Sequence, residues 1–176
     1  MRKLRLLAAA LTMLVSVTLH KEPAHASQRV IEARPLETFP RERIAIETRS
    51  ARRHVFDAWR ADTDETRAQG LMFVEHLTPE QAMVFVYDPP QSVSMWMRNT
   101  YIPLDMLFAD AAGCIVNIAA NTTPLSLESI AGVKPVAYVV EVAAGTAAAR
   151  GITVGDRIVR FETQQDSEGT FQACTR

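Results

Sequence analysis

The chain has 176 residues, with 19 Lys and Arg against 20 Asp and Glu, and a formal net charge of −1. This length is sufficient for one domain with a real hydrophobic core. The charge balance argues against nucleic acid or an anionic membrane surface as a partner, because both require a basic footprint on the protein.

The N-terminal segment 1–26 is typical of a secretory signal peptide. A basic start precedes an apolar run over 6–19, and Ala24-His25-Ala26 matches a small-x-small cleavage site. The run is shorter than the roughly 20 residues that span a bilayer, so a membrane anchor is the less favoured alternative. We expect cleavage after Ala26 and a mature protein that is periplasmic or secreted. Cleavage removes four of the 19 basic and one of the 20 acidic residues, which leaves a net charge of −4.

The mature chain divides into three parts. Residues 27–42 are polar and have no hydrophobic period, which predicts a flexible arm. A β-rich domain is expected over 43–163, and a polar tail over 164–176. Strands are predicted over 43–47, 54–61, 82–87, 105–109, 114–119, 136–142 and 157–161, because β-branched and aromatic residues gather there between turn signals.

Short helical segments interrupt these strands. A helix is predicted over 62–69, with Asp62 as its cap, Glu65 completing a capping box, and Gly70 as its stop. Thr78-Pro79-Glu80-Gln81 carries a second helix-start signal, and Asp88-Pro89-Pro90 is expected to break the strand that follows it. One helical turn is allowed near Leu127.

A helical turn over 145–150 is predicted to end at Gly151. The strand over 136–142 has apolar residues on both faces, which is typical of a central strand. These elements predict a mainly β (β-rich α+β) single domain: a compact barrel or jelly-roll-like sandwich with one or two short helices. No membrane span is expected after removal of the signal peptide.

Two cysteines, Cys114 and Cys174, suit an oxidising compartment. A disulfide between them would close a long loop and would stabilise the fold by roughly 4 kcal/mol in the chain-entropy model. Two free thiols remain the alternative, since the sequence does not give the Cα separation.

The mature chain offers few residues for known chemistry. Its histidines, His54 and His76, have no carboxylate or cysteine at ligand spacing, so no metal site is predicted. A phosphate-binding glycine loop and a nucleophile elbow are both missing, and no cofactor is predicted. Whether the protein is an enzyme stays open.

The stretch 93–106 combines Trp96, Arg98, Asn99 and Asp105 with apolar residues. Burial of such polar groups is unfavourable unless each finds a partner, so the stretch is either a satisfied structural corner or a ligand site. In an extended segment, Trp96 would point away from Met95 and Met97. An aromatic face with nearby carboxylate and amide groups is also typical of sites for sugars and other small polar ligands.

Glu141 is the second notable polar residue. It follows the apolar run Val139-Val140, where burial of an acid is unfavourable. Glu141 and Asp105 would be compatible with acid/base hydrolysis of a glycoside if their carboxyl groups shared one cleft.

Several segments resemble the family called domain of unknown function 192. The resemblance rests on Arg67-Ala68-Gln69-Gly70-Leu71-Met72, Ala82-Met83-Val84-Phe85, Met95-Trp96-Met97-Arg98-Asn99-Thr100 with Pro103-Leu104-Asp105, Tyr138-Val139-Val140-Glu141-Val142, and Gly155-Asp156. It covers roughly 56–161, and Val93-Ser94 departs from the bulky apolar residue expected before the tryptophan motif. The resemblance implies a compact, mainly β domain and no accepted activity.

Three functions follow as hypotheses. The leading one is an exported β-domain that binds a small polar or carbohydrate-like ligand, or an envelope partner. The alternatives are a hydrolase with Asp105 and Glu141 as its acid/base pair, and an envelope assembly or interaction protein with an exposed apolar patch. The candidate ligand-binding residues are Trp96, Arg98, Asn99, Thr100, Asp105 and Glu141.

Overall fold

The structure, a computed structural model, describes residues 33–161 and residue 174. These residues belong to the compact unit 31–176. The predicted signal peptide, the start of the predicted arm and the predicted tail, apart from Cys174, lie outside the described residues. Within the described part, the helices are too short or too polar to cross a membrane.

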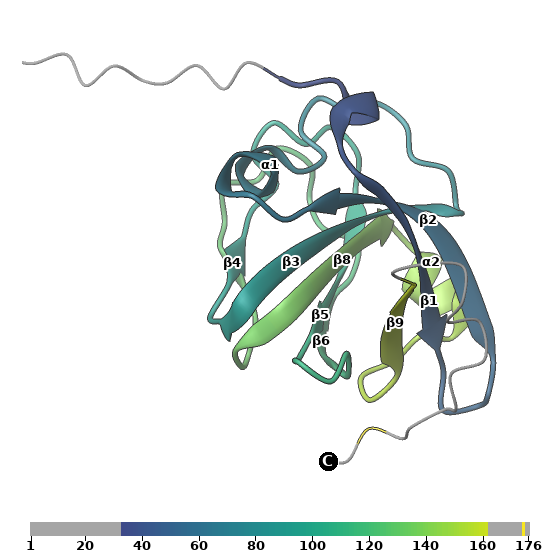
Figure 1. The fold of residues 1–176 in the computed structure, drawn as a ribbon. Helices are drawn as coiled ribbons and strands as arrows, with labels where there is room; N and C mark the ends of the chain where they lie inside the picture. Colours follow the sequence, from purple (N-terminus) through teal and green to yellow (C-terminus); the bar gives the residue numbers. More distant parts are fainter. Residues whose placement is uncertain (1–32, 162–173, 175–176) are drawn as a thin grey trace, which may run out of the picture. The chain divides into compact units, whose positions relative to one another are not determined.

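One curled sheet dominates the fold and forms a half-barrel with the strand order β6-β5-β8-β3-β2-β1-β9 (Figure 1). The mainly β, barrel-like domain predicted from the sequence is confirmed. The strands are Arg41–Glu47 (β1), Arg53–Ala61 (β2), Gln81–Gln91 (β3), Leu104–Ala109 (β5), Ile115–Ala119 (β6), Val136–Ala143 (β8) and Arg157–Phe161 (β9). Two short strands, Ser94–Met95 (β4) and Ile130–Ala131 (β7), form a separate pair.

Three short helical elements accompany the strands: the 3-10 turn η1 (Leu36–Thr38), α1 (Asp64–Gln69) and α2 (Thr146–Arg150). α1 connects β2 to β3, which pair in parallel. Thr63, rather than the predicted Asp62, caps α1: its hydroxyl accepts the Thr66 N–H, while the Thr66 hydroxyl accepts the Thr63 N–H. The two threonines therefore form the capping box.

β8 occupies the middle of the sheet, as predicted, between β5 and β3. Its side chains alternate between the two faces. Val139 joins one hydrophobic cluster, which also contains Met83 and Met106. Val140 joins a second cluster, which also contains Leu107. Both faces of the central sheet are thus covered by apolar cores.

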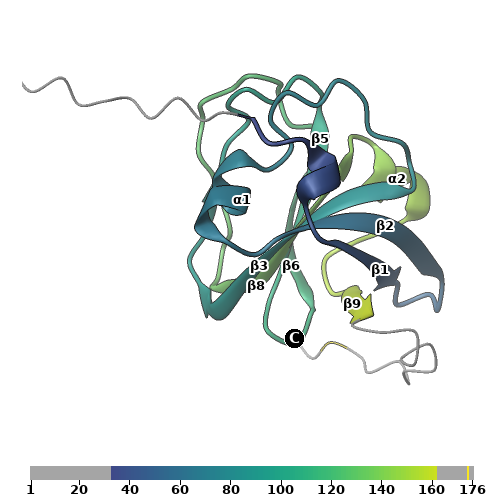
Figure 2. The ribbon, with the colours of Figure 1, turned by 45° about the horizontal axis from the view of Figure 1, so that its top comes forward.

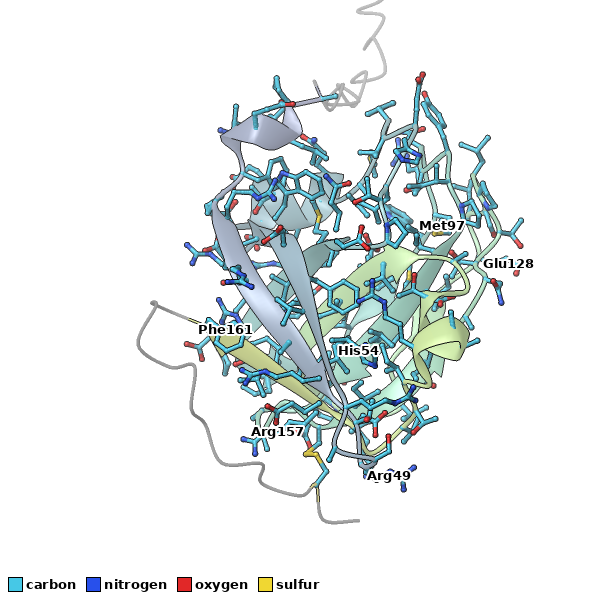
Figure 3. The ribbon with its side chains drawn as sticks, turned by 90° about the vertical axis from the view of Figure 1, so that its right-hand side faces the viewer. Arg49, His54, Met97, Glu128, Arg157 and Phe161 are labelled. Carbon is cyan, nitrogen blue, oxygen red and sulfur yellow. A yellow bond between two sulfur atoms is a disulfide. The ribbon has the colours of Figure 1, made fainter. Side chains whose placement is uncertain are left out.

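The two edge strands of the sheet, β6 and β9, approach each other next to Cys114. Cys114 forms an isolated bridge with Arg157, and Ile158 donates its N–H to the Gly113 carbonyl at 2.8 Å. A Cβ atom at Gly113 would collide with the carbonyl oxygen of Ile158, so this approach requires glycine. Cys114 is also joined to Cys174 by a disulfide, with Cα atoms 5.7 Å apart (Figure 3). The bridge fixes Cys174 at this seam.

Two local predictions were wrong. β3 continues through Asp88-Pro89-Pro90, where the Asp88–Pro89 bond is cis and the register against β8 shifts. Thr78 does not start a helix: Gln81 begins β3, and its side chain accepts the Thr78 N–H. The residues of the helix-start signal do make the expected local hydrogen bond. No helix follows, because Gln81 pairs within the sheet as the first residue of β3.

The described part of the predicted arm, 33–42, packs against the domain. Phe39 is only 3 % exposed and belongs to the core. The main chain of Arg34 donates to the Gln69 side chain and accepts from it, both at 2.8 Å. The sequence did not reveal this packing because Phe39 is the one buried residue of the segment, and the polar residues around it predict a flexible arm.

Candidate functional site

A pocket of about 260 Å³ lies between α1, β3, β4 and the segment 96–100. α1 and β4 flank β3 at the left of the ribbon in Figure 1, and Figure 2 shows α1 with the top of the molecule turned forward. Four of the six residues predicted for the site line this pocket, and several unpredicted ones join them. The polar and aromatic lining residues are Asp64, Arg67, Gln69, Phe85, Tyr87, Ser94, Trp96, Arg98, Thr100 and Glu141.

The alternation expected around Trp96 holds for Met97, whereas Met95 lines the pocket together with Trp96. Met97 is fully buried and belongs to the core, and its sulfur accepts the Thr122 hydroxyl at 3.1 Å. Trp96 is 48 % exposed and lines the pocket. The methionine therefore anchors the segment and the indole faces solvent.

Glu141 lies deep in the pocket. Its strand neighbours are Met83 on β3 and Met106 on β5, so the carboxyl group projects on the face of the first apolar cluster. The residue is 4 % exposed. Within residues 33–161 and 174, no group donates a hydrogen bond to this carboxyl. Its oxygens are not among the fully buried side-chain atoms that lack a partner, because they open onto the pocket. Burial raises the pKa of Glu141 to about 8.

Arg67 and Tyr87 form a wall of the pocket that the sequence did not single out. Arg67 donates to the carbonyls of Asp62 and Val86 at 2.7 and 2.8 Å. It also pairs with Asp64 at 2.6 Å and lies 5.4 Å from the Tyr87 ring. Burial, followed by the charge of Glu141, raises the pKa of Tyr87 to about 12. The available signal was the position of Arg67 in the family motif.

Arg98 and Thr100 lie on the tryptophan side of the pocket. The Arg98 guanidinium is 5.6 Å from the centre of the Trp96 ring, a cation–π contact. Thr100 is buried, and its hydroxyl donates to the Arg98 carbonyl at 3.3 Å. Thr100 therefore supports the turn that holds Arg98.

Asn99 has a conformational role. Its φ is +55°, in the left-handed region, inside a turn closed by the Thr100 N–H and the Met97 carbonyl at 3.0 Å. The Asn99 carbonyl accepts the Phe73 N–H at 2.8 Å. Asn99 does not line the pocket. Asparagine tolerates this backbone region better than most residues, which explains its presence in the turn.

We expect Asn99→Ala to lower the free energy of unfolding by about 1 kcal/mol, because alanine does not relieve the left-handed strain. Asn99→Gly should be the more stable of the two variants, although glycine raises the entropy of the unfolded chain. Urea denaturation of both variants measures the difference. Equal losses would mean that the asparagine side chain, rather than the backbone, holds the turn.

Asp105 lies away from the pocket. It pairs with Val142 across β5 and β8, while Glu141 faces Met106, so the two carboxyl groups project on opposite faces of the sheet. Asp105 is fully buried. Its oxygens accept the N–H groups of Asn121 at 2.8 Å and Ala147 at 2.9 Å. Asp105 thus ties β5 to α2 and does not line the pocket.

This arrangement excludes the predicted acid/base pair of Asp105 and Glu141. A glycosidase requires both carboxyl groups to flank one scissile bond. Here the sheet separates them, and both oxygens of Asp105 are already occupied by main-chain donors.

The sequence profile of the family domain of unknown function 192, described as an uncharacterized ACR, matches residues 45–160. A crystal structure of a candidate transcription regulator from Sinorhizobium meliloti is 39 % identical, with a TM-score of 0.68, over 69 % of this chain and 95 % of that one. A protein of unknown function from Novosphingobium aromaticivorans is 35 % identical, with a TM-score of 0.69, over 72 % and 90 % of the two chains. No curated protein matches the chain.

Proposed function

Because the chain belongs to the domain of unknown function 192 family, whose name assigns no activity, we propose its function from the pocket: it binds a small polar, carbohydrate-like ligand. The description of the Sinorhizobium protein as a candidate regulator is not extended to this chain, which lacks an excess of basic residues. On the secretory signal predicted over 1–26, we propose that this activity lies in the periplasm or outside the cell.

The unpartnered carboxyl group of Glu141 carries the proposal. Glu141 lies among methionines and aromatic residues, its carboxyl group faces the pocket, and no hydrogen bond from the described residues reaches it. A ligand with hydroxyl groups would supply the missing partner. A carboxyl group with a pKa of about 8 is mostly protonated at neutral pH, so it can donate as well as accept.

The dimensions and lining of the pocket support a sugar-sized ligand. Its volume of about 260 Å³ exceeds the roughly 150 Å³ of an engineered cavity that admits benzene. Trp96 offers a half-exposed aromatic face at the opening, and aromatic faces pack well on the C–H groups of a sugar ring. Tyr87 and Phe85 add apolar wall below it.

We expect monosaccharides to bind saturably and to change the fluorescence of Trp96. The variant Trp59→Phe leaves Trp96 as the sole tryptophan, because these are the only two in the chain. Neutral, acetylated and acidic monosaccharides serve as probes, with calorimetry on the unmodified chain as a second measurement. Glu141→Met should weaken binding about tenfold or more, since it removes a buried hydrogen bond of roughly 1.5 kcal/mol.

Glu128→Met is the matched control. Glu128 is exposed, lies at the surface in Figure 3, and is not among the residues that line the pocket. This variant should bind the same probes as the unmodified chain. If no monosaccharide binds saturably, or if Glu141→Met binds as well as Glu128→Met, the pocket is not a site for such ligands.

A further inference from the structure

Arg98 presents its guanidinium group at the pocket without a protein acceptor. The side chain is exposed and stacks on Trp96, with 5.6 Å between the guanidinium carbon and the ring centre. In the part of the chain that the structure describes, no hydrogen bond or ion pair engages its N–H groups. Stacking on an aromatic ring leaves the planar edge of a guanidinium group open to an acceptor.

Arg67, the other arginine of the pocket, is not available in this way. Three of its five N–H groups donate to the carbonyls of Asp62 and Val86 and to the Asp64 carboxylate. Its charge is neutralised by the Asp64 pair at 2.6 Å. The protein therefore engages most of the Arg67 guanidinium, and Arg98 is the arginine of the pocket without a protein acceptor in the described residues.

The pocket consequently has an excess of one positive charge. Asp64 offsets Arg67, and Glu141, with its pKa raised to about 8 by burial, is mostly uncharged at neutral pH. Nothing in the lining offsets Arg98. A positive pocket in a chain with more acidic than basic residues favours an anionic ligand.

We propose that the ligand is an acidic monosaccharide of the hexuronate class, whose carboxylate binds the Arg98 guanidinium edge while its ring packs on Trp96 and its hydroxyl groups reach Glu141. This inference rests on the proposed function. A planar carboxylate matches the guanidinium fork with two parallel hydrogen bonds. A neutral sugar would leave that fork without a partner.

The test compares glucuronate with glucose, glucuronamide and glucose 6-phosphate by calorimetry on the full chain at low salt. Glucuronamide keeps the shape of glucuronate without its charge, and the phosphate ester carries a different anion. We expect glucuronate to bind about ten- to hundredfold more tightly than glucose or glucuronamide, as charge-assisted bidentate hydrogen bonds allow. Arg98→Gln should abolish this preference, so that glucuronate binds no more tightly than glucuronamide.

Arg43→Gln is the matched control, because Arg43 is an exposed arginine of β1 outside the pocket. It should keep the preference for glucuronate. Equal binding of glucuronate and glucose would overturn the anionic ligand while the proposed function stands. Tighter binding of glucose 6-phosphate would overturn the carboxylate class. Absence of binding by all four probes would overturn the proposed function itself.

Discussion

Glu141→Gln is expected to stabilise the protein above neutral pH. Burial raises the pKa of Glu141 to about 8 in the folded state, against 4.5 in the unfolded chain. The folded state thus retains its proton over a pH range where the unfolded state has released it. The stability linked to this proton is fully present below about pH 4.5 and is lost as the pH rises through 8. The loss is of the order of 5 kcal/mol at pH 9.

Glutamine has nearly the same shape but no proton to release, so the variant should lack this loss. Chemical denaturation of both proteins at several pH values between 5 and 9 measures it. The difference in the free energy of unfolding should be small at pH 5 and should grow to several kcal/mol at pH 9. Glu128→Gln, at an exposed position, should follow the curve of the unmodified protein.

Other ionisable groups around the pocket do not alter this direction. Asp64 and Arg67 neutralise each other, Arg98 is exposed, and Tyr87 has a pKa of about 12, beyond the range tested. His54, whose pKa is lowered mainly by burial, lowers stability at acid pH, but it does so equally in both proteins. Parallel curves for the unmodified protein and the Glu141→Gln variant would show that the carboxyl group is solvated.

The pH dependence connects stability with function. A neutral or apolar residue at position 141 would give a more stable domain above neutral pH, because Met83, Met106 and their neighbours already form an apolar environment. An acid at this position weakens the fold, and a ligand that hydrogen-bonds it recovers part of the loss. Residues that weaken a fold in this way cluster at functional sites.

Much of the fold follows from local patterns. β8 was placed centrally because its apolar residues occupy both faces, and hydrogen bonding to β3 and β5 agrees. Gly70 and Gly151 follow the last residues of α1 and α2, as predicted, and both have positive φ. The prolines at 89 and 90 misled because they fall where the register between β3 and β8 shifts, between Val86 and Gln91. A proline is tolerated at such an irregularity, since no ladder hydrogen bond requires its missing N–H.

The site was only partly predictable because the register between β5 and β8 decides which side chains face the pocket. Glu141 was identified because burial of an acid in an apolar strand is unfavourable, and Trp96 because polar residues surround it in an apolar stretch. Both line the pocket. Burial of Asp105 looked equally unfavourable. The face of the sheet on which its carboxyl group lies, however, depends on which residue of β8 it opposes. That residue is Val142, and a shift of one position would have placed Asp105 beside Glu141. Single-sequence patterns do not fix the register between distant strands.

The structural role of Asp105 gives the second large expected effect. Asp105→Ala should lower the free energy of unfolding by about 3–5 kcal/mol, because the buried N–H groups of Asn121 and Ala147 both lose their acceptor. Asp105→Asn should lose less, about 2 kcal/mol, since one amide oxygen still accepts. Urea denaturation at pH 7 compares the variants.

Asp110 provides the matched comparison for this prediction. Its carboxyl oxygen also accepts two main-chain N–H groups, those of Ala112 and Cys114, but in a partly exposed hairpin. Asp110→Ala should lose only about 1 kcal/mol, because water replaces the missing acceptor. Folded Asp105→Asn protein should bind monosaccharides like the unmodified chain. A loss of binding without a loss of stability would return Asp105 to the ligand site and contradict the role assigned to it.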